Sequence, residues 1–272
     1  MGVFDFFSKP SIMGILNITP DSFSDGGIFF DYKRAVDHAV RMAEEGADII
    51  DVGGESTRPG AKPVTTEEEL KRVIPVIRAL TREVEVVLSI DTTKARVAEE
   101  ALAAGAGMVN DVSALQFDPE MASVVAKTAV PVVLMHMRGS PRIMQYNTRY
   151  NNLMAEIAAF LRDRISFAEA AGIEKEKIII DPGIGFGKSI EKGNFLILKN
   201  LKELKCLGRP ILAGPSRKAF LGHLLDLPVE DREEATAAAV AVAVMNGANI
   251  IRVHDVKKMM RVVQVVDAIK NS

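Results

Sequence analysis

Residues 32–61 read YKRAVDHAVRMAEEGADIIDVGGESTRPGA and contain a helix, a strand and a loop in order. Apolar side chains recur in 32–47 at the three- and four-residue spacing of an amphipathic helix, and Gly46 lies near its end. The run DIIDV (48–52) is short and rich in isoleucine and valine, which is typical of a buried strand. The segment GGESTRPGA (53–61) predicts a turn-forming loop. This order of elements is the repeating unit of an α/β fold.

Short apolar runs of the same kind recur along the whole chain. The eight runs are IMGILN (12–17), DIIDV (48–52), VVLSID (86–91), MVNDV (108–112), VVLMH (132–136), KIIID (177–181), PILAG (210–214) and NIIRVH (249–254). They lack regular polar alternation, so we expect a parallel sheet that is buried on both faces. Eight strand–helix units in 272 residues predict an α/β fold, a single TIM (β/α)8 barrel over residues 1–272 with the active site at the C-terminal rim of the strands.

A doubly wound sheet is the competing architecture, and it would normally carry a phosphate-binding fingerprint after an early strand. The nearest candidate is GIGFGKS (183–189), which ends like a P-loop. A P-loop requires glycine five residues before Gly187, and that position holds Pro182. We therefore reject this interpretation and predict a flexible glycine-rich loop where the backbone approaches a ligand.

Composition excludes several classes of function. The chain has 34 basic and 36 acidic residues, so it offers no basic field for nucleic acid. The most apolar run, AAAVAVAVM (237–245), is far shorter than the roughly 20 residues of a membrane helix, and we expect a buried helix there. A single cysteine, Cys206, and an N-terminus without a signal-peptide pattern favour a cytoplasmic protein with small-molecule partners.

Polar side chains stand at or just after the end of nearly every predicted strand. They are Asn17, Asp51, Asp91, Asn110 with Asp111, His136, Asp181, Lys218, and Arg252 with His254. Each one alone has an ordinary structural explanation as a helix cap or a hydrogen-bonded loop residue. Together they predict a functional site on the C-terminal rim of the barrel.

Asp91, Asn110, Asp181 and Lys218 would present two carboxylates, an amide and a cation to one ligand. A carboxylate can make a bidentate pair with an N–C–N edge, so this set suits a polar heterocycle. Paired carboxylates also serve retaining glycosidases, and the pair alone does not separate the two functions.

The loops 17–27 and 53–61 add anion and metal chemistry. Arg58, with Arg252 and His254, would bind a phosphate-like leaving group, although a solvated loop charge is an equal alternative for Arg58. Asn17 with Asp21 and Asp25 could support Mg²⁺. Phe23 lies in a polar loop, which favours an aromatic lid over a loop anchor.

Taken in order, a series of motifs resembles the dihydropteroate synthase family. The motifs are GILNITPDSFSDGG, DVGGESTRPGA, SIDT, NDVSA, LMHMRG, DPGIGFGK, GPSRKAF and RVHDV, spanning residues 14–256. The resemblance implies a transferase that joins 4-aminobenzoate to 6-hydroxymethyl-7,8-dihydropterin diphosphate, giving 7,8-dihydropteroate and pyrophosphate. It also implies Mg²⁺ as cofactor, a homodimer, and a target of sulfonamides.

The resemblance further implies a role for individual residues. Catalytic roles fall to Asp25, Arg58, Asp91, Lys218, Arg252 and His254, and the metal contact falls to Asn17. Pterin diphosphate would be bound by Thr57, Asp91, Asn110, Asp181, Lys218, Arg252 and His254. The 4-aminobenzoate pocket would be formed by Phe23, Pro59, Lys218 and Ala219. Ala219 stands where many relatives have serine, so its backbone N–H must replace a hydroxyl contact.

Two other functions remain open at this stage. A pterin-binding methyltransferase domain would share the pterin contacts but would release no pyrophosphate. A non-catalytic pterin-binding barrel would have no use for leaving-group ligands, so Arg58, Lys218 and His254 argue against it.

Overall fold

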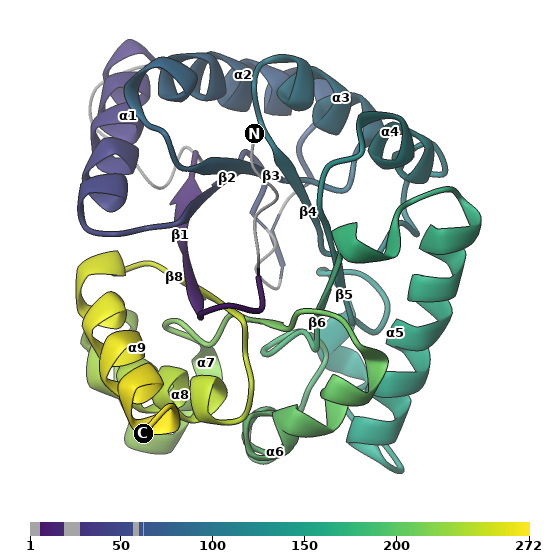
Figure 1. Ribbon diagram of the computed structural model, residues 1–272, viewed down its shortest axis with the longest axis vertical. Helices are drawn as coiled ribbons and strands as arrows, with labels where there is room; N and C mark the ends of the chain where they lie inside the picture. Colours follow the sequence, from purple (N-terminus) through teal and green to yellow (C-terminus); the bar gives the residue numbers. More distant parts are fainter. Residues whose placement is uncertain (1–5, 19–27, 57–59, 62) are drawn as a thin grey trace.

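The computed structural model describes residues 6–18, 28–56, 60–61 and 63–272, with the side chains of 28–31 left out. Its centre is an eight-stranded sheet of parallel strands in the order β6-β5-β4-β3-β2-β1-β8-β7 (Figure 1). The strands are β1 (Ser11–Asn17), β2 (Ile49–Gly53), β3 (Val87–Asp91), β4 (Met108–Asp111), β5 (Val132–Met135), β6 (Ile178–Asp181), β7 (Leu212–Ala213) and β8 (Ile250–Val253). All eight predicted runs therefore contain a strand.

The sheet curves round on itself, and its two edge strands meet. Ile180 of β6 forms an isolated parallel bridge with Ile211, the residue before β7. The Ile180 amide donates to the carbonyl of Pro210 at 2.9 Å. The last gap in the ring is thus crossed by backbone contacts, which confirms the predicted TIM barrel.

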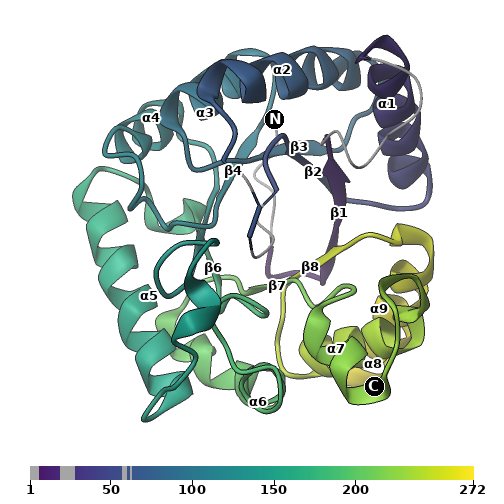
Figure 2. The same ribbon diagram turned by 180° about the vertical axis from the view of Figure 1, so that it is seen from behind.

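Helices surround the ring of strands in both views (Figures 1 and 2). They are α1 (Ile28–Glu44), α2 (Thr66–Glu83), α3 (Ala95–Ala103), α4 (Met121–Thr128), α5 (Leu153–Ala170), α6 (Gly193–Asn200), α7 (Ala219–Leu225), α8 (Glu233–Met245) and α9 (Val256–Lys270). Side chains cap three of the starts, with Thr65, Asn152 and Asp255 accepting from backbone amides at the beginning of α2, α5 and α9. Among the described helices, none is both long and apolar enough to cross a membrane.

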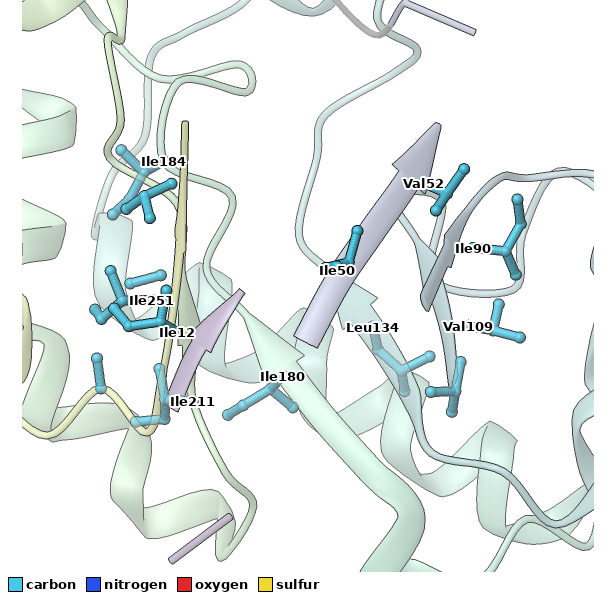
Figure 3. Packing of buried hydrophobic residues seen from close by; sticks show 14 of the residues in the cluster. Ile12, Ile50, Val52, Ile90, Val109, Leu134, Ile180, Ile184, Ile211 and Ile251 are labelled. Atoms are coloured by element: carbon cyan, nitrogen blue, oxygen red, sulfur yellow. The ribbon is translucent and has the colours of Figure 1, made fainter. Parts of the chain in front are cut away.

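The two faces of each strand serve different parts of the core. Outward side chains such as Ile50, Val52 and Ile90 pack against the helices in one large apolar cluster (Figure 3). Inward side chains at the N-terminal ends of the strands, together with Phe6, form a second cluster inside the barrel. This second cluster fills the N-terminal half of the barrel interior, and the pocket-forming polar groups lie in the C-terminal half.

Side chains alternate along a strand, so every second residue points inward. Above Ile49 of β2 the next inward position is Asp51, and above Val87 of β3 the inward positions are Ser89 and Asp91. The register pairs Asp91 with Asn110 on β4. Polar residues that look isolated in the sequence therefore gather on the inner wall of one end of the barrel.

Two expectations need correction. The segment 237–245 is not buried throughout: Ala239, Val240 and Ala243 of α8 are buried, whereas Val242 and Met245 are exposed. The amphipathic pattern of α8 was obscured because alanine and valine occupy both faces. The helix predicted from residue 32 begins earlier, at Ile28.

Candidate active site

The C-terminal end of the barrel holds a pocket where the predicted polar residues meet. Its polar lining is formed by Asp91, Asn110, Asp181, Lys218 and Arg252. These residues come from β3, β4, β6, the start of α7 and β8. The rest of the lining is formed by Val112, Met135, Ile184, Phe186 and Gly214. Polar groups beside flat apolar walls are the surroundings that a planar heterocycle requires.

Arg252 is held by two carboxylates. Its Nε donates to Oδ2 of Asp51 at 2.6 Å, and its Nη2 donates to Oδ2 of Asp91 at 2.7 Å. The same oxygen of Asp51 accepts from Nδ2 of Asn110 at 2.9 Å. Asp51 is completely buried and therefore fixes the orientation of both Arg252 and Asn110.

Asp51 is the residue to which sequence reasoning assigned no role. Its place at the end of a strand was visible, but its partners come from strands 59 and 201 residues further along the chain. The available signal was the alternation along β2, which places Asp51 on the inner wall together with Asp91.

The electrostatics of the pocket place the pKa of Asp91 near neutral pH. Burial raises the pKa of Asp91 to about 7, although Arg252 opposes this shift; the negative charge of Asp51 adds to it. Burial acts to lower the pKa of the Arg252 guanidinium, but Asp51 and Asp91 outweigh burial and raise it. The cation of Arg252 is therefore permanent, whereas Asp91 can exchange a proton near neutral pH.

Asp181 faces the pocket from the end of β6. Its Oδ1 accepts from the amide of Gly183 at 2.7 Å. Burial raises the pKa of Asp181, and the opposing influences are this backbone hydrogen bond and the charges of Lys218, Lys188 and Arg252. Three cations thus oppose the effect of burial on Asp181 and favour its ionised, acceptor-only form.

Lys218 and the glycine-rich loop after β6 form one wall of the pocket. The Nζ of Lys218 lies 4.3 Å from the ring centre of Phe186, within the range of a cation–π contact. Gly185, with φ of +86°, passes so close to Lys218 that a Cβ there would lie 2.9 Å from its Cδ. The sequence indicated a flexible loop, but hydrogen bonds hold this one. The Gly185 amide donates to the Asn194 side chain, and the side chains of Gln145 and Tyr150 donate to the carbonyls of Gly185 and Gly187.

The remaining described candidates lie around the rim. Nδ1 of His254 is 2.9 Å from Oγ of Ser216, which also accepts from the His254 amide at 3.2 Å. Asn17 is half-buried at the end of β1, and Ala219 is exposed at the first position of α7. None of these three lines the pocket of Asp91 and Asp181 as described.

Two strand-end residues have the structural role that was weighed as the alternative. The carboxylate of Asp111 accepts from the amides of Ser113 and Leu115, each at 2.8 Å, and so shapes a turn. His136 is buried, with its ring edge-on to Phe160 and its Nδ1 bonded to Lys188. Neither residue lines the pocket of Asp91 and Asp181 as described.

Several predicted residues lie outside the described residues. They are Asp21, Phe23, Asp25, Thr57, Arg58 and Pro59. Within the described ranges no group of three His, Cys, Asp or Glu side chains is arranged to hold a metal ion. The metal contact of Asn17 stays a prediction.

Known proteins resemble this chain over nearly its whole length. A family model described as a pterin binding enzyme matches residues 13–254. The dihydropteroate synthase of Synechocystis is 48% identical over 268 residues, covering 98% of this chain and 92% of that protein. A Yersinia pestis dihydropteroate synthase structure with a sulfonamide drug complex superposes with a TM-score of 0.93 at 46% identity, covering 99% and 97% of the two chains. A Xanthomonas albilineans dihydropteroate synthase structure with 4-aminobenzoic acid gives 0.92 at 48% identity, covering 98% and 95%.

Proposed function

The chain belongs to the dihydropteroate synthases of the pterin-binding enzyme family, and from this premise we propose which substrate or step each of its site residues serves. The enzyme condenses 6-hydroxymethyl-7,8-dihydropterin diphosphate with 4-aminobenzoate and releases pyrophosphate, which makes it a transferase of folate synthesis. The convergence of Asp91, Asn110, Asp181 and Lys218 on one pocket carries the assignment of residues.

The pterin ring lies in this pocket with its polar edge toward the carboxylates. An ionised carboxylate accepts two N–H donors, and the 2-amino and adjacent ring N–H groups of a pterin supply such a pair to Asp181. Asn110, fixed by Asp51, offers its amide oxygen to a further donor. Phe186 and Met135 would cover the ring faces, with Arg252 at the end of the pocket toward the diphosphate.

The diphosphate would meet the rim residues Thr57, Arg58 and His254, together with Arg252. Charge-assisted hydrogen bonds to phosphate oxygens strengthen as the leaving group gains charge, so these contacts act on turnover more than on ground-state binding. The 4-aminobenzoate pocket would be completed by Phe23, Pro59 and Ala219, beside Lys218. The backbone N–H of Ala219 takes the place of the hydroxyl contact.

Asn17 fits a Mg²⁺ ion that enters with the diphosphate. Its amide oxygen is a hard donor, and Gly53 leaves space beside it: a Cβ on Gly53 would lie 3.7 Å from this oxygen and 3.5 Å from the Cβ of Asp91. Mg²⁺ prefers one or two protein ligands plus substrate phosphates. Bound there, it would neutralise charge on the diphosphate oxygens, and Asp25 would stand near it.

The chemistry is dissociative. The bond between the pterin methylene carbon and the diphosphate oxygen breaks, and the oxygen keeps the electron pair. Asp91 and Asp181 place negative charge beside the ring that becomes cationic, and this interaction strengthens in the transition state. The amine nitrogen of 4-aminobenzoate then forms the new bond and loses a proton to solvent.

The deciding experiment is a coupled assay for pyrophosphate with pterin diphosphate, 4-aminobenzoate and Mg²⁺, omitting each component in turn. We expect pyrophosphate only with the complete mixture. Methyl transfer from methyltetrahydrofolate without pyrophosphate release would instead identify a pterin-binding methyltransferase.

We also propose that the enzyme is a cytoplasmic homodimer. Exposed apolar side chains occur on α7, α8 and α9, three helices that lie close together in Figures 1 and 2. They are Leu224 and Leu225 of α7, Val242 and Met245 of α8, and Val265 and Ile269 of α9. An apolar surface of this kind suits a self-complementary interface. Sedimentation equilibrium should give a dimer, and Val265→Lys should shift it toward the monomer.

The same premise extends to inhibitors. A relative from Yersinia pestis has been solved with a sulfonamide drug complex. We expect a sulfonamide to compete with 4-aminobenzoate for this enzyme, raising its KM without lowering kcat.

A further inference from the structure

Lys188 is a buried lysine for which the reaction has no direct use. Its side chain is 1% exposed, at the end of the glycine-rich loop that follows β6. Its Nζ lies 2.8 Å from Nδ1 of His136 and donates to the His136 carbonyl at 2.9 Å. Burying an amine is costly unless its donors are satisfied, so this arrangement serves a purpose in the fold or the site.

The contact between Lys188 and His136 connects the end of β5 with the pocket wall. The amide of His136 donates to the carbonyl of Asp181 at 2.8 Å, which joins β5 to the strand that carries Asp181. Gly183, with φ of +71°, packs against this junction: a Cβ there would lie 2.0 Å from the His136 carbonyl oxygen and 2.9 Å from Nζ of Lys188. Only glycine fits this approach.

The loop between Asp181 and Lys188 supplies two lining residues of the pocket. Ile184 and Phe186 both face it, and the amide of Phe186 donates to the Gly183 carbonyl at 3.0 Å. The Gly183 amide in turn donates to Oδ1 of Asp181. A continuous chain of contacts thus joins Lys188 to His136, His136 to Asp181, and Asp181 through Gly183 to the wall residue Phe186.

We propose that Lys188 is a positioning residue for the pterin: through His136 it holds the loop 182–187 against the end of β5, so that Asp181 and Phe186 keep their places in the pocket. This inference rests on the proposed function of the pocket. Lys188 does not line the pocket, so its effect on the pterin passes through those two residues.

The charges around the lysine agree with this role. Burial lowers the pKa of His136 to about 2, with Lys188 and Arg138 adding to the shift, so the imidazole is neutral and its Nδ1 can accept from the amine. Burial likewise lowers the pKa of Lys188 well below its ordinary value, and Asp181 opposes the shift. In its protonated state Lys188 favours the carboxylate form of Asp181.

The pH dependence of pterin affinity distinguishes a role of Lys188 through charge and hydrogen bonds from a role through packing alone. The cations that act on Asp181 are Lys188, Lys218 before α7 and Arg252 of β8, and Lys218 and Arg138 act on Lys188. His136 is neutral and contacts Lys188. Substituting Lys188 changes one of these cations and leaves the others. The part of the pH-dependent loss of pterin affinity that comes from Asp181 should then move to higher pH, because Asp181 is protonated more easily.

The test compares Lys188→Met with Lys192→Met, an exposed lysine in the same connection. Calorimetry with 6-hydroxymethylpterin is expected to show a ten- to hundredfold weaker Kd for Lys188→Met, from loss of hydrogen bonds worth about 1.5–3 kcal/mol, and an upward shift of the pH midpoint. The KM for pterin diphosphate should rise in proportion, with kcat at saturation changing less than the KM. Lys192→Met should match the wild type in all these measurements.

A second pair of variants covers the case where Lys188→Met fails to fold. His136→Asn keeps an acceptor near the position of Nδ1 and should retain pterin affinity, whereas His136→Leu removes it and should weaken affinity. An unchanged Kd and pH midpoint in Lys188→Met, or equal affinities in the two His136 variants, would overturn the proposal. Failure of the wild type to release pyrophosphate would overturn the proposed function instead, because the variant comparison is made on binding.

Discussion

Asp51→Asn isolates the effect of one buried charge on the pterin pocket. Oδ2 of Asp51 accepts from both Asn110 and Arg252, whereas Oδ1 is buried without a hydrogen-bond partner among the described residues. The amide oxygen of asparagine can take the place of Oδ2, and its NH2 group then stands where no hydrogen bond exists. The substitution therefore removes the charge and keeps the acceptor.

The expected consequence is a lower pKa for Asp91. The negative charge of Asp51 raises that pKa, and Arg252, relieved of one carboxylate, would interact more strongly with Asp91. At an effective dielectric constant of about 20, two unit charges about 4–8 Å apart interact by about 2–4 kcal/mol. With about 1.4 kcal/mol per pKa unit, the pKa of Asp91 should fall by at least about one unit from its value of about 7.

Binding measurements at two pH values reveal this shift. We expect ionised Asp91 to accept a pterin N–H group alongside Asp181, so affinity is present above the pKa of Asp91 and is lost as the pH falls through it. With a pKa of about 7 the Kd should weaken about tenfold between pH 8 and pH 6, but only about twofold with a pKa of about 6. Calorimetry with 6-hydroxymethylpterin gives both ratios, and the ligand's own titration cancels in the comparison.

Asp48→Asn is the matched control. Asp48 lies just before β2, where its Oδ2 accepts from the Ile12 amide at 2.9 Å, at the opposite end of the strand from the pocket. It should leave the tenfold ratio unchanged. If Asp51→Asn also shows the wild-type ratio, Asp51 does not control the proton on Asp91 and the electrostatic account of the pocket is incorrect.

Three further predictions concern the individual substrate contacts. Asp181→Asn should weaken pterin affinity about ten- to hundredfold, because an amide cannot accept two N–H donors and a charge-assisted hydrogen bond is worth about 1.5–3 kcal/mol; unchanged calorimetry would remove Asp181 from the pterin site. Arg58→Ala should lower kcat more than pterin affinity, and wild-type turnover would identify Arg58 as an ordinary surface charge. Aminobenzoate should bind poorly to the free enzyme and more tightly with pterin, pyrophosphate and Mg²⁺ present, because Phe23 and Pro59 belong to the loops predicted to meet the diphosphate; equal affinity in all states would mean a preformed pocket.

The barrel was predictable because each of its strands is marked by a short stretch of the sequence itself. Each strand is a short apolar run, and a closed parallel sheet buries both faces of all eight strands. Strand ends were less certain by one or two residues, and this matters for function. His136 and His254 were assigned to strands but follow Met135 and Val253, the last residues of β5 and β8.

The pairings within the site were not predictable in the same way, because they depend on register between distant strands. Asp91 lies opposite Asn110 across β3 and β4, and Arg252 reaches across the barrel to Asp51 and Asp91. Asp111 directly follows Asn110, which lines the pocket, so alternation along β4 turns the Asp111 side chain away from the barrel interior. The difference is the direction of the side chain: Asp91 points inward, whereas Asp111 turns to the backbone amides of its own loop.

The pairing of Arg252 also changes what the rim must supply. Its positive charge is shared between two carboxylates, so less of it is left for diphosphate than the sequence prediction assumed. Lys218 lies over Phe186 beside the carboxylate of Asp181, where its charge serves the pterin end of the pocket. A leaving diphosphate therefore depends on groups beyond this network, which fits the predicted roles of Arg58 and His254. The carboxylates, Arg252 and Lys218 of the pocket are thus separate from the rim residues Arg58 and His254. The pocket can hold a pterin ring beside carboxylates while the rim residues bind the leaving diphosphate.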